Sequence, residues 1–352
     1  MGSTGELLQK LQEGRGDEAL RGLYALDGSD ASLEKGRERA VRVVRAFEAE
    51  FGARPEAALF SGPGRTEIGG NHTDHQHGRV LCGSVDLDML ACAAPNGTDL
   101  VRIQSEGYPA LEVDLRDLKV REEEKNSSPA LVRGVAARLA ELGCRPAGFD
   151  AYVTSTVLSG SGLSSSAAYE ILVATIIDCF FGGGTLDPVE RAKVGQYAEN
   201  VYFGKPCGLM DQMGSSVGGA VAIDFADPAA PVVKKVEYDF TRSGHALCIV
   251  DTGSCHADLT DDYADITREM GAVAAHFGKK FLRDVDEGAF RAALPQLRQE
   301  CGDRAVLRTM HFFEEDCRAE QEAQALEQGD FAAFLALVDQ SGLSSALNLQ
   351  NT

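Results

Sequence analysis

The sequence lacks the features that mark a protein of membranes or of the secretory route. No uninterrupted apolar run approaches the roughly 18 residues that a helix needs to cross a bilayer. Its first residues, Met1 to Gln12, lack the basic-then-apolar order of a signal peptide. The sequence therefore predicts a chain that is neither secreted nor inserted in a membrane, and we expect it in the cytoplasm.

Cysteine-based stabilisation has little support in the sequence. The nine cysteines are odd in number, and no two of them form a Cys-x-x-Cys pair. Cys82, Cys92 and Cys179 stand in apolar stretches, as buried thiols of a reducing compartment do. We therefore expect neither a disulfide framework nor a zinc site.

Basic residues are scarce for a chain of 352 residues. Lys and Arg number 34 against 54 Asp and Glu, which gives a formal net charge of -20. No stripe of Lys or Arg overrides this acidic balance, so the sequence argues against a nucleic-acid partner. The same charge repels ATP at long range, and a nucleotide site would need its own local positive field.

The order of apolar segments predicts an α+β fold. Helix-like and strand-like segments are mixed without the steady alternation of a doubly wound parallel sheet. Segment 167–181 is apolar nearly all round, which predicts a buried helix. Further helices are expected up to residue 51 and at 130–142, 187–202, 262–277, 312–328 and 330–338. Strands are expected at 58–60, 80–82, 85–92, 100–104, 111–115, 152–157, 217–225 and 245–251.

A loop of glycine and serine at 159–168 is the strongest chemical signal. Its glycines let the backbone approach a ligand closely, and its serines stand where a helix begins. The N-terminus of a helix offers unpaired N–H groups and the positive end of a dipole, which suit a phosphate. The loop is not a P-loop, because no Lys-Ser or Lys-Thr follows the glycines. The alternative is a plain turn from strand to helix.

A second polar segment, 64–78, packs Arg, Asn, His and Asp between glycines. Carboxylates accept from hydroxyl groups and amides both donate and accept, so the segment suits a polyhydroxylated ligand. The rival interpretation is a metal site of a hydrolase, because His and Asp side chains have ligand-like spacing. Those side chains are His72, Asp74, His75 and His77.

A third segment, 204–212, places Asp211 on a loop of glycine and proline. A carboxylate in such a loop is usually a turn former. The interpretation changes if the loop lies beside Arg65.

Taken together, the three segments resemble the galactokinases of the GHMP small-molecule kinase family. Residues 65–78 look like the signature Gly-Arg-x-x-x-x-Gly-Glu-His-Thr-Asp-Tyr, and 158–168 look like the phosphate loop Gly-x-Gly-Leu-Ser-Ser-Ser-Ala. Residues 207–212 look like Cys-Gly-Ile-Met-Asp-Gln. Weaker similarity continues at 252–263 and 325–341. The segments follow the family's order over roughly residues 57–345.

The resemblance implies a fold, an activity and partners. The fold would be that of a two-domain GHMP kinase, with a helical extension at 1–52, an N-terminal domain like ribosomal protein S5 at 53–230, and a C-terminal α+β domain at 231–352. The activity would be ATP-dependent phosphorylation of the anomeric hydroxyl of galactose, giving galactose 1-phosphate and ADP with the help of Mg²⁺. The protein would be a monomer or weak oligomer without a nucleic-acid or membrane partner.

The resemblance also implies roles for single residues. Asp211 would be the catalytic carboxylate and Arg65 its partner. One of Ser165 or Ser166, with Glu199, would hold Mg²⁺. The sugar would be held by Asn71, His72, Asp74, Gly208 and Tyr263. The ATP phosphates would be held by Gly160, Ser161, Gly162, Leu163, Ser164, Ser165, Ser166 and Ala167.

Three departures from the family pattern leave alternatives open. Asn71 stands where the signature has Glu, and His75 stands where it has Tyr. The sequence also lacks the family's glycine-rich C-terminal segment, so we expect a fragment or a shortened homologue. The alternatives are a kinase for a related sugar, such as N-acetylgalactosamine or arabinose, and a non-catalytic regulator that binds sugar and ATP.

Overall fold

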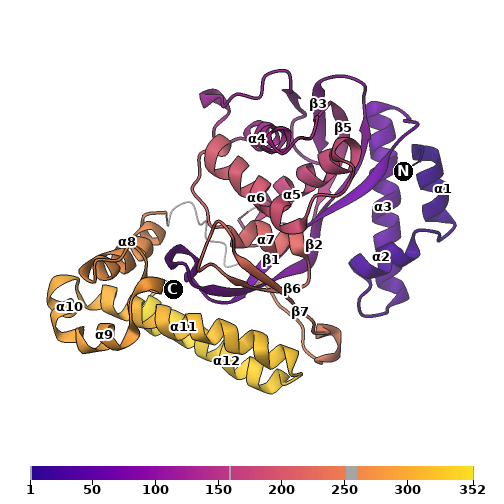
Figure 1. The fold of residues 1–352 in the computed structure, drawn as a ribbon. Coiled ribbons are helices and arrows are strands. Elements are labelled where there is room, and N and C mark those ends of the chain that lie inside the picture. Colours follow the sequence, from indigo (N-terminus) through magenta and orange to yellow (C-terminus); the bar gives the residue numbers. More distant parts are fainter. Residues whose placement is uncertain (1, 158–159, 251–259, 352) are drawn as a thin grey trace. The chain divides into compact units, whose positions relative to one another are not determined.

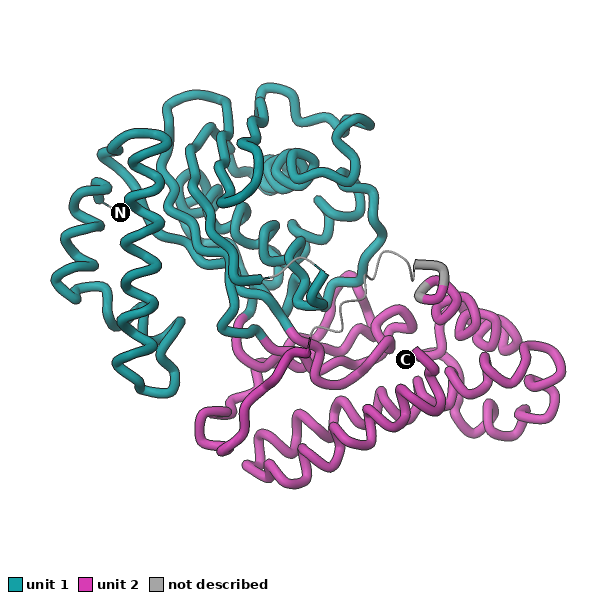
Figure 2. Tube along the Cα trace, turned by 180° about the vertical axis from the view of Figure 1, so that it is seen from behind, with its two compact units in different colours: residues 1–65, 84–217 teal, residues 66–83, 218–352 magenta. Residues whose placement is uncertain are grey.

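The computed structural model describes residues 2–157, 160–250 and 260–351. The chain forms two compact units (Figure 2): unit 1 comprises residues 1–65 and 84–217, and unit 2 comprises residues 66–83 and 218–352. The chain passes between them within two long strands, β1 (Ala58–Gly69) and β2 (Arg79–Pro95). Each unit is built from two separate stretches of the sequence. The domain limits expected at 52 and 230 assumed continuous stretches, and they stay predictions.

The strands of unit 1 form a mixed sheet. Its strands follow the order β4-β3-β5-β2, and β1 pairs with β2. The pair β3–β5 is parallel, whereas β3–β4 and β2–β5 are antiparallel. The additional strands are β3 (Leu100–Ser105), β4 (Leu111–Asp114) and β5 (Phe149–Ser155).

Strand β2 shows how both faces of this sheet are covered. Ala91 and Ala93 belong to the core that packs against helices α4 to α6, while Leu90 and Cys92 belong to the core beneath the N-terminal helices. Because successive side chains of a strand point to opposite faces, this alternation places helices on both sides (Figure 1). The N-terminal helices are α1 (Thr4–Gln12), α2 (Asp17–Tyr24) and α3 (Asp30–Phe51).

The opposite face carries the helices that position the candidate site. Ten of the 13 residues of α5 are buried, which confirms the prediction of a buried helix. Residues 165–182 are long and apolar enough to cross a membrane, but 61% of them are buried inside unit 1, as expected of a core helix. The helices are α4 (Ser128–Glu141), α5 (Ser165–Ile177), α6 (Pro188–Tyr197) with the π-helix η4 (Ala198–Phe203), and α7 (Met210–Val217).

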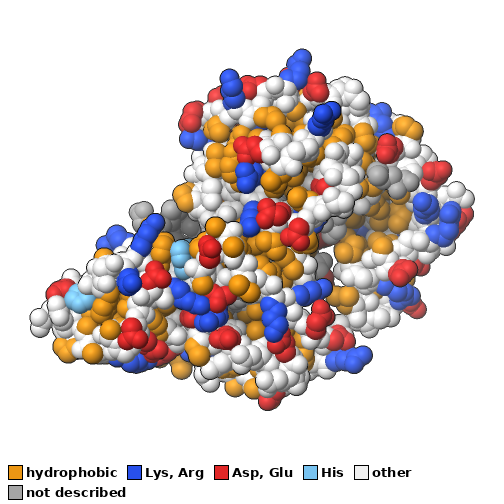
Figure 3. All heavy atoms as spheres, viewed as in Figure 1, with side chains coloured by type: hydrophobic (Ala, Val, Ile, Leu, Met, Phe, Trp, Pro, Cys, Tyr) orange, Lys and Arg blue, Asp and Glu red, His pale blue; other side chains and the backbone are white. Residues whose placement is uncertain are grey.

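Unit 2 joins two later strands to helices from the second half of the chain. The start of β2 pairs with β6 (Ala220–Asp224), which in turn pairs with β7 (Val232–Val236). Acidic and basic side chains are interspersed over the face shown in Figure 3. The helices are α8 (Thr260–His276), α9 (Glu287–Ala292), α10 (Leu294–Glu300), α11 (Asp303–Glu327) and α12 (Phe331–Ser344).

The prediction of a strand at 245–251 is wrong for residues 245–250, the part of this segment that the structure describes. Residues 245–250 form no strand, and Leu247 and Val250 are 65% and 80% exposed. An apolar run becomes a strand only if a neighbouring strand offers free N–H and C=O groups. In the described part of the chain, no strand pairs with this segment.

Candidate active site

The glycine and serine loop leads directly into helix α5. Gly160 and Gly162 have φ angles of 78° and 77°, a left-handed conformation that glycine adopts without steric cost. Helix α5 begins at Ser165, and no side chain in the described part of the chain caps it. Its first N–H groups therefore suit an anion, as expected for a phosphate loop. Residues 158 and 159, at the start of the motif, lie outside the described residues.

Two glycines of β1 allow this loop and α5 to approach the strand closely. A Cβ atom at Gly62 would lie 2.4 Å from the carbonyl oxygen of Ala168, which is closer than real Cβ contacts allow. A Cβ atom at Gly64 would lie 3.1 Å from the carbonyl oxygen of Leu163. The strand can therefore lie against the loop because these alternate positions have no side chain.

Arg65 and Asp211 form a bidentate ion pair inside unit 1. Nε of Arg65 donates to Oδ1 of Asp211 at 2.8 Å, and Nη2 lies 2.7 Å from Oδ2. Arg65 is on β1 and Asp211 is in the first turn of α7, so 146 residues separate them. Burial raises the pKa of Asp211, but the charge and hydrogen bonds of Arg65 outweigh it and hold the pKa below its usual value.

The same arginine is hydrogen-bonded to the loop of glycine and serine. Its backbone N–H donates to the carbonyl of Leu163 at 3.1 Å, and its Nη1 donates to the carbonyl of Gly162 at 2.5 Å. The hydroxyl of Ser164 donates to Oδ2 of Asp211 at 2.7 Å. The structure thus brings together the loop, the guanidinium and the carboxylate that sequence reasoning selected.

A second carboxylate, Glu199, lies beside the first turn of α5. Ser166 donates its hydroxyl hydrogen to Oε1 of Glu199 at 3.2 Å. The side-chain amide of Gln212 donates to Glu199 at 2.8 Å and to Glu170 at 3.0 Å. Both carboxylates are buried, and burial together with Glu199 raises the pKa of Glu170 well above its usual value.

Sequence reasoning missed Glu170 and Gln212. Glu170 is the one charged residue in 167–177, an otherwise apolar helical stretch, and this isolation was an available signal. A carboxyl group there must find a buried partner or stay neutral. Gln212 stands in the motif at 207–212, but sequence reasoning gave it no role.

The signature residues of unit 2 are held by helix α11 and the helical turn after α12. The backbone N–H of Asn71 donates to Glu315 at 3.4 Å, and its side-chain amide donates to the hydroxyl of Ser345 at 2.7 Å. Nε2 of His311 donates to the carbonyl of Asn71 at 2.8 Å. Sequence reasoning missed these three partners, which stand in no motif.

Two histidines of the signature loop, His72 and His75, face one another. His72 has a left-handed φ of 59°, and its Nδ1 lies 3.5 Å from Nε2 of His75. Burial and the proximity of His75 lower the pKa of His72 to about 4. Among the described residues, no group of three or more His, Cys, Asp or Glu side chains could hold a metal ion. The geometry therefore gives the metallohydrolase interpretation no support.

The other residues expected to bind the sugar lie in the signature loop, in the loop before α7 and in α8. Asp74 opens a 3-10 turn (Asp74–Gln76) in the signature loop, and its Oδ1 lies 3.5 Å from His75. Gly208 is in the loop that precedes α7. Tyr263 is in α8, but its side chain lies outside the described part, as does the neighbouring motif at 252–256.

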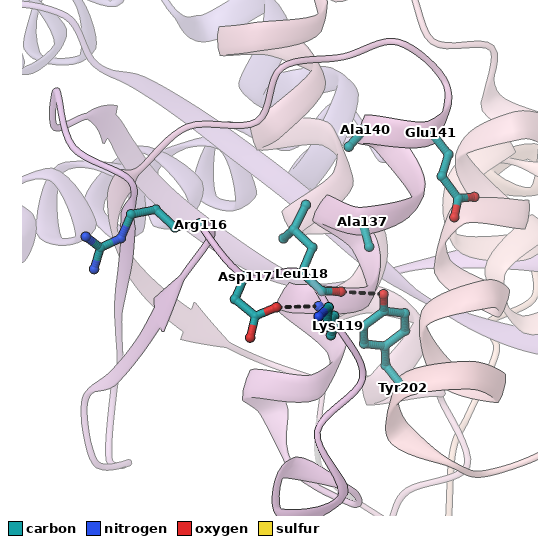
Figure 4. A pocket seen from close by; sticks show the side chains of 8 residues that line it. All are labelled: Arg116, Asp117, Leu118, Lys119, Ala137, Ala140, Glu141 and Tyr202. Atoms are coloured by element: carbon teal, nitrogen blue, oxygen red, sulfur yellow. Dashed lines mark hydrogen bonds between the residues drawn. The ribbon is translucent and has the colours of Figure 1, made fainter.

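A surface hollow of about 520 Å³ in unit 1 lies apart from these residues (Figure 4). The hydroxyl of Tyr202 donates to the carbonyl of Leu118 at 2.6 Å on its wall. None of the expected site residues lines it, so it carries no assignment. Its lining residues are Arg116, Asp117, Leu118, Lys119, Ala137, Ala140, Glu141 and Tyr202.

Comparison with known proteins first gives the class. Residues 130–219 match the family model for the GHMP kinases N-terminal domain, and residues 45–95 match the galactokinase galactose-binding signature. The fold is similar to that of Lactococcus lactis galactokinase complexed with galactose, with a TM-score of 0.70 and 22% identity over 86% of this chain and 78% of that one. Fold and site therefore define a GHMP kinase.

Sequence relatives narrow this class. The chain is 33% identical to a galactokinase of Streptomyces coelicolor over 292 residues, which cover 83% of this chain and 74% of that protein. It is 32% identical to a galactokinase of Homo sapiens over 305 residues, 84% of this chain and 75% of that protein. The chain belongs to the galactokinase family, as the three motifs predicted.

Proposed function

We propose that this protein transfers the terminal phosphoryl group of ATP to the anomeric hydroxyl of galactose, giving galactose 1-phosphate and ADP. The observation that carries the proposal is the bidentate Arg65–Asp211 pair, fastened to the phosphate loop by Gly162 and Leu163. The names of the sequence relatives support the reaction, and the galactose in the complex of the Lactococcus enzyme supports the sugar.

The arrangement suits phosphoryl transfer, which depends on positioning and on compensation of phosphate charge. The uncapped N-terminus of α5 and the guanidinium of Arg65 would compensate that charge. Asp211 would accept the hydrogen of the attacking hydroxyl. Because its pKa is low, Asp211 is a weak base and would mainly orient the hydroxyl, taking the proton as the new bond forms.

The residues near α5 fit a magnesium ion bound together with ATP. Mg²⁺ usually takes one or two carboxylates, with water and phosphate oxygens filling its octahedron. Glu199 supplies a buried carboxylate, and Ser166 supplies a hydroxyl 3.2 Å from it. We propose that Glu199 and one of Ser165 or Ser166 would hold the ion, which when bound neutralises phosphate charge.

The sugar-binding roles of Asn71, His72, Asp74, Gly208 and Tyr263, and the phosphate-binding roles of residues 160–167, are part of this proposal. The side chain of Asn71 already donates one N–H to Ser345, so it would contact a sugar through its carbonyl oxygen or its second N–H. We further propose that the protein acts in the cytoplasm as a monomer or weak oligomer, without a nucleic-acid or membrane partner.

A coupled assay of ADP release over a panel of sugars tests the function. We expect release that depends on galactose and is weaker with N-acetylgalactosamine and arabinose. In the same assay Asp211→Ala should release little ADP. Asp117→Ala is its matched control, because Asp117 is an exposed aspartate outside the site. ADP release that does not respond to any sugar in the panel would contradict the proposal.

A further inference from the structure

We propose that Ser164 is a positioning residue for phosphoryl transfer, whose hydroxyl holds the Asp211 carboxylate instead of capping helix α5. The proposal rests on the proposed function and assigns Ser164 a role beyond contact with phosphate. Three observations carry it: an unused capping position, a left-handed backbone and the way Asp211 is held.

Ser164 occupies the N-cap position of α5 but makes no capping hydrogen bond. A serine at this position normally accepts a hydrogen bond from a backbone N–H two or three residues later. Two other serines of unit 1 do so: Ser3 accepts from Glu6, and Ser29 accepts from Ser32. The hydroxyl of Ser164 instead donates to Asp211 at 2.7 Å.

The backbone of Ser164 is left-handed, with φ 56° and ψ 68°. This conformation is costly for a residue with a Cβ atom and persists where the surroundings impose it. The two preceding carbonyls, of Gly162 and Leu163, accept from Arg65, and the carbonyl of Ser164 accepts from the N–H of Ala168 at 3.1 Å. These contacts hold the backbone from both sides and direct the hydroxyl toward Asp211.

Ser164 and Arg65 together fix the plane of the Asp211 carboxylate. Nε of Arg65 holds Oδ1, while Nη2 of Arg65 and the hydroxyl of Ser164 both hold Oδ2. The ion pair alone would keep the carboxylate near Arg65, but the serine adds a contact from another element and resists rotation about the side-chain bond. A reacting group that is slightly misplaced loses much of its rate advantage.

The same arrangement serves the phosphate loop. Because the hydroxyl points to Asp211, it does not occupy the N–H groups of Ser166 and Ala167, which a capping serine would take. Those groups stay available to phosphate oxygens. One side chain would thus orient the acceptor of the sugar proton and leave the anion site open.

Two substitutions separate the hydroxyl from the backbone. Ser164→Gly removes the hydroxyl but tolerates the left-handed conformation. Ser164→Asn also tolerates it and supplies an amide donor. Asn126→Gly is the matched control, because Asn126 has a left-handed φ of 59° and belongs to no predicted site.

The expected result is a lower kcat with substrate binding retained. For Ser164→Gly we expect kcat to fall between about ten- and a hundredfold while KM for ATP changes less than about twofold. Ser164→Asn should recover part of kcat, and Asn126→Gly should match the wild type. An unchanged kcat in Ser164→Gly, a raised KM for ATP as its only effect, or an Asn variant no faster than the Gly variant would overturn the proposal.

A crystal structure of Ser164→Gly gives a readout that does not depend on turnover. A rotated Asp211 carboxylate supports the proposal, and an unchanged carboxylate overturns it. The two proposals fail differently: a wild-type chain without sugar-dependent ADP release removes the proposed function, whereas an active wild type with an equally active Gly variant removes only the role of Ser164.

Discussion

The imidazole of His311 donates to the main-chain carbonyl of Asn71 across 2.8 Å, and its other nitrogen lies 2.9 Å from the hydroxyl of Ser344. His311 is fully buried, and burial lowers its pKa, so the ring is neutral near pH 7. In this tautomer Nε2 carries the hydrogen and Nδ1 accepts from the serine. The signature loop of unit 2 is thus held by a histidine 240 residues further along the chain.

Removing this ring should weaken sugar binding selectively. His311→Ala leaves the carbonyl of Asn71 without its donor and frees the loop that carries the expected sugar ligands. We expect KM for galactose to rise roughly tenfold, since a lost buried hydrogen bond costs about 1–2 kcal/mol. KM for ATP should stay unchanged. Steady-state kinetics with each substrate varied in turn measures both. Equal rises in the two constants would contradict this role, and the exposed His245→Ala serves as control.

Glu322 should make stability depend on pH. It is fully buried, neither of its carboxylate oxygens has a hydrogen-bond partner among the described residues, and burial with the nearby Glu315 raises its pKa to about 8. The folded state therefore holds a proton that the unfolded state, with a pKa near 4.5, releases. Stability should fall as pH rises from about 4.5 to about 8, by no more than about 5 kcal/mol.

Glu322→Gln should remove this dependence, because glutamine does not ionise. Urea denaturation of both proteins between pH 5 and pH 8.5 measures it, with the exposed Glu237→Gln as control. We expect the variant to gain stability over the wild type as pH rises. Parallel stability curves for the two proteins would show that Glu322 does not titrate in this range.

Gly62 should be intolerant of any side chain. The Cβ atom of Gly62→Ala would collide with the carbonyl of Ala168 and push α5 away from β1. We expect a loss of about 1–3 kcal/mol of stability. Gly5→Ala is the matched control, because a Cβ atom there meets nothing within 4 Å inside helix α1, and it should stabilise by up to about 1 kcal/mol. Thermal denaturation compares them. Equal effects of the two substitutions would refute the close packing.

Glu199 should set the magnesium requirement. Glu199→Gln keeps the shape of the side chain but removes the charge that would bind the ion. We expect half-maximal activity to need about tenfold more Mg²⁺, with KM for galactose unchanged. A magnesium titration of activity and of nucleotide binding measures it, with the partly exposed Glu190→Gln as control. An unchanged titration would remove Glu199 from the metal site.

The sequence predicted the local features of the site better than its long-range partners. The turn of glycine and serine at 159–168 and the helix that follows it are local, so residue types alone indicated them. That Arg65 meets Asp211, 146 residues away, was expected only from resemblance to a family. His311, Glu315 and Ser345 act through such distant contacts without any motif, and no local pattern could reveal them.

For the fold, too, local features were predicted better than long-range ones. Mixed helices and strands and the buried helix α5 followed from apolar patterning. The strand expected at 245–251 was wrong because its apolar run has no strand beside it in the described part of the chain. The two units are discontinuous because β1 and β2 are long enough to serve both, and single-strand length is poorly predicted by local sequence.

The most direct test of the account is the turnover of Asp211→Ala with galactose, measured together with its affinity for ATP. Arg65 keeps its hydrogen bonds to the carbonyls of Gly162 and Leu163 when the carboxylate is removed, so the substitution should spare the phosphate loop. We predict that kcat falls by at least about a thousandfold while the Kd for ATP changes only a few-fold. A variant that keeps near-normal kcat would contradict the account.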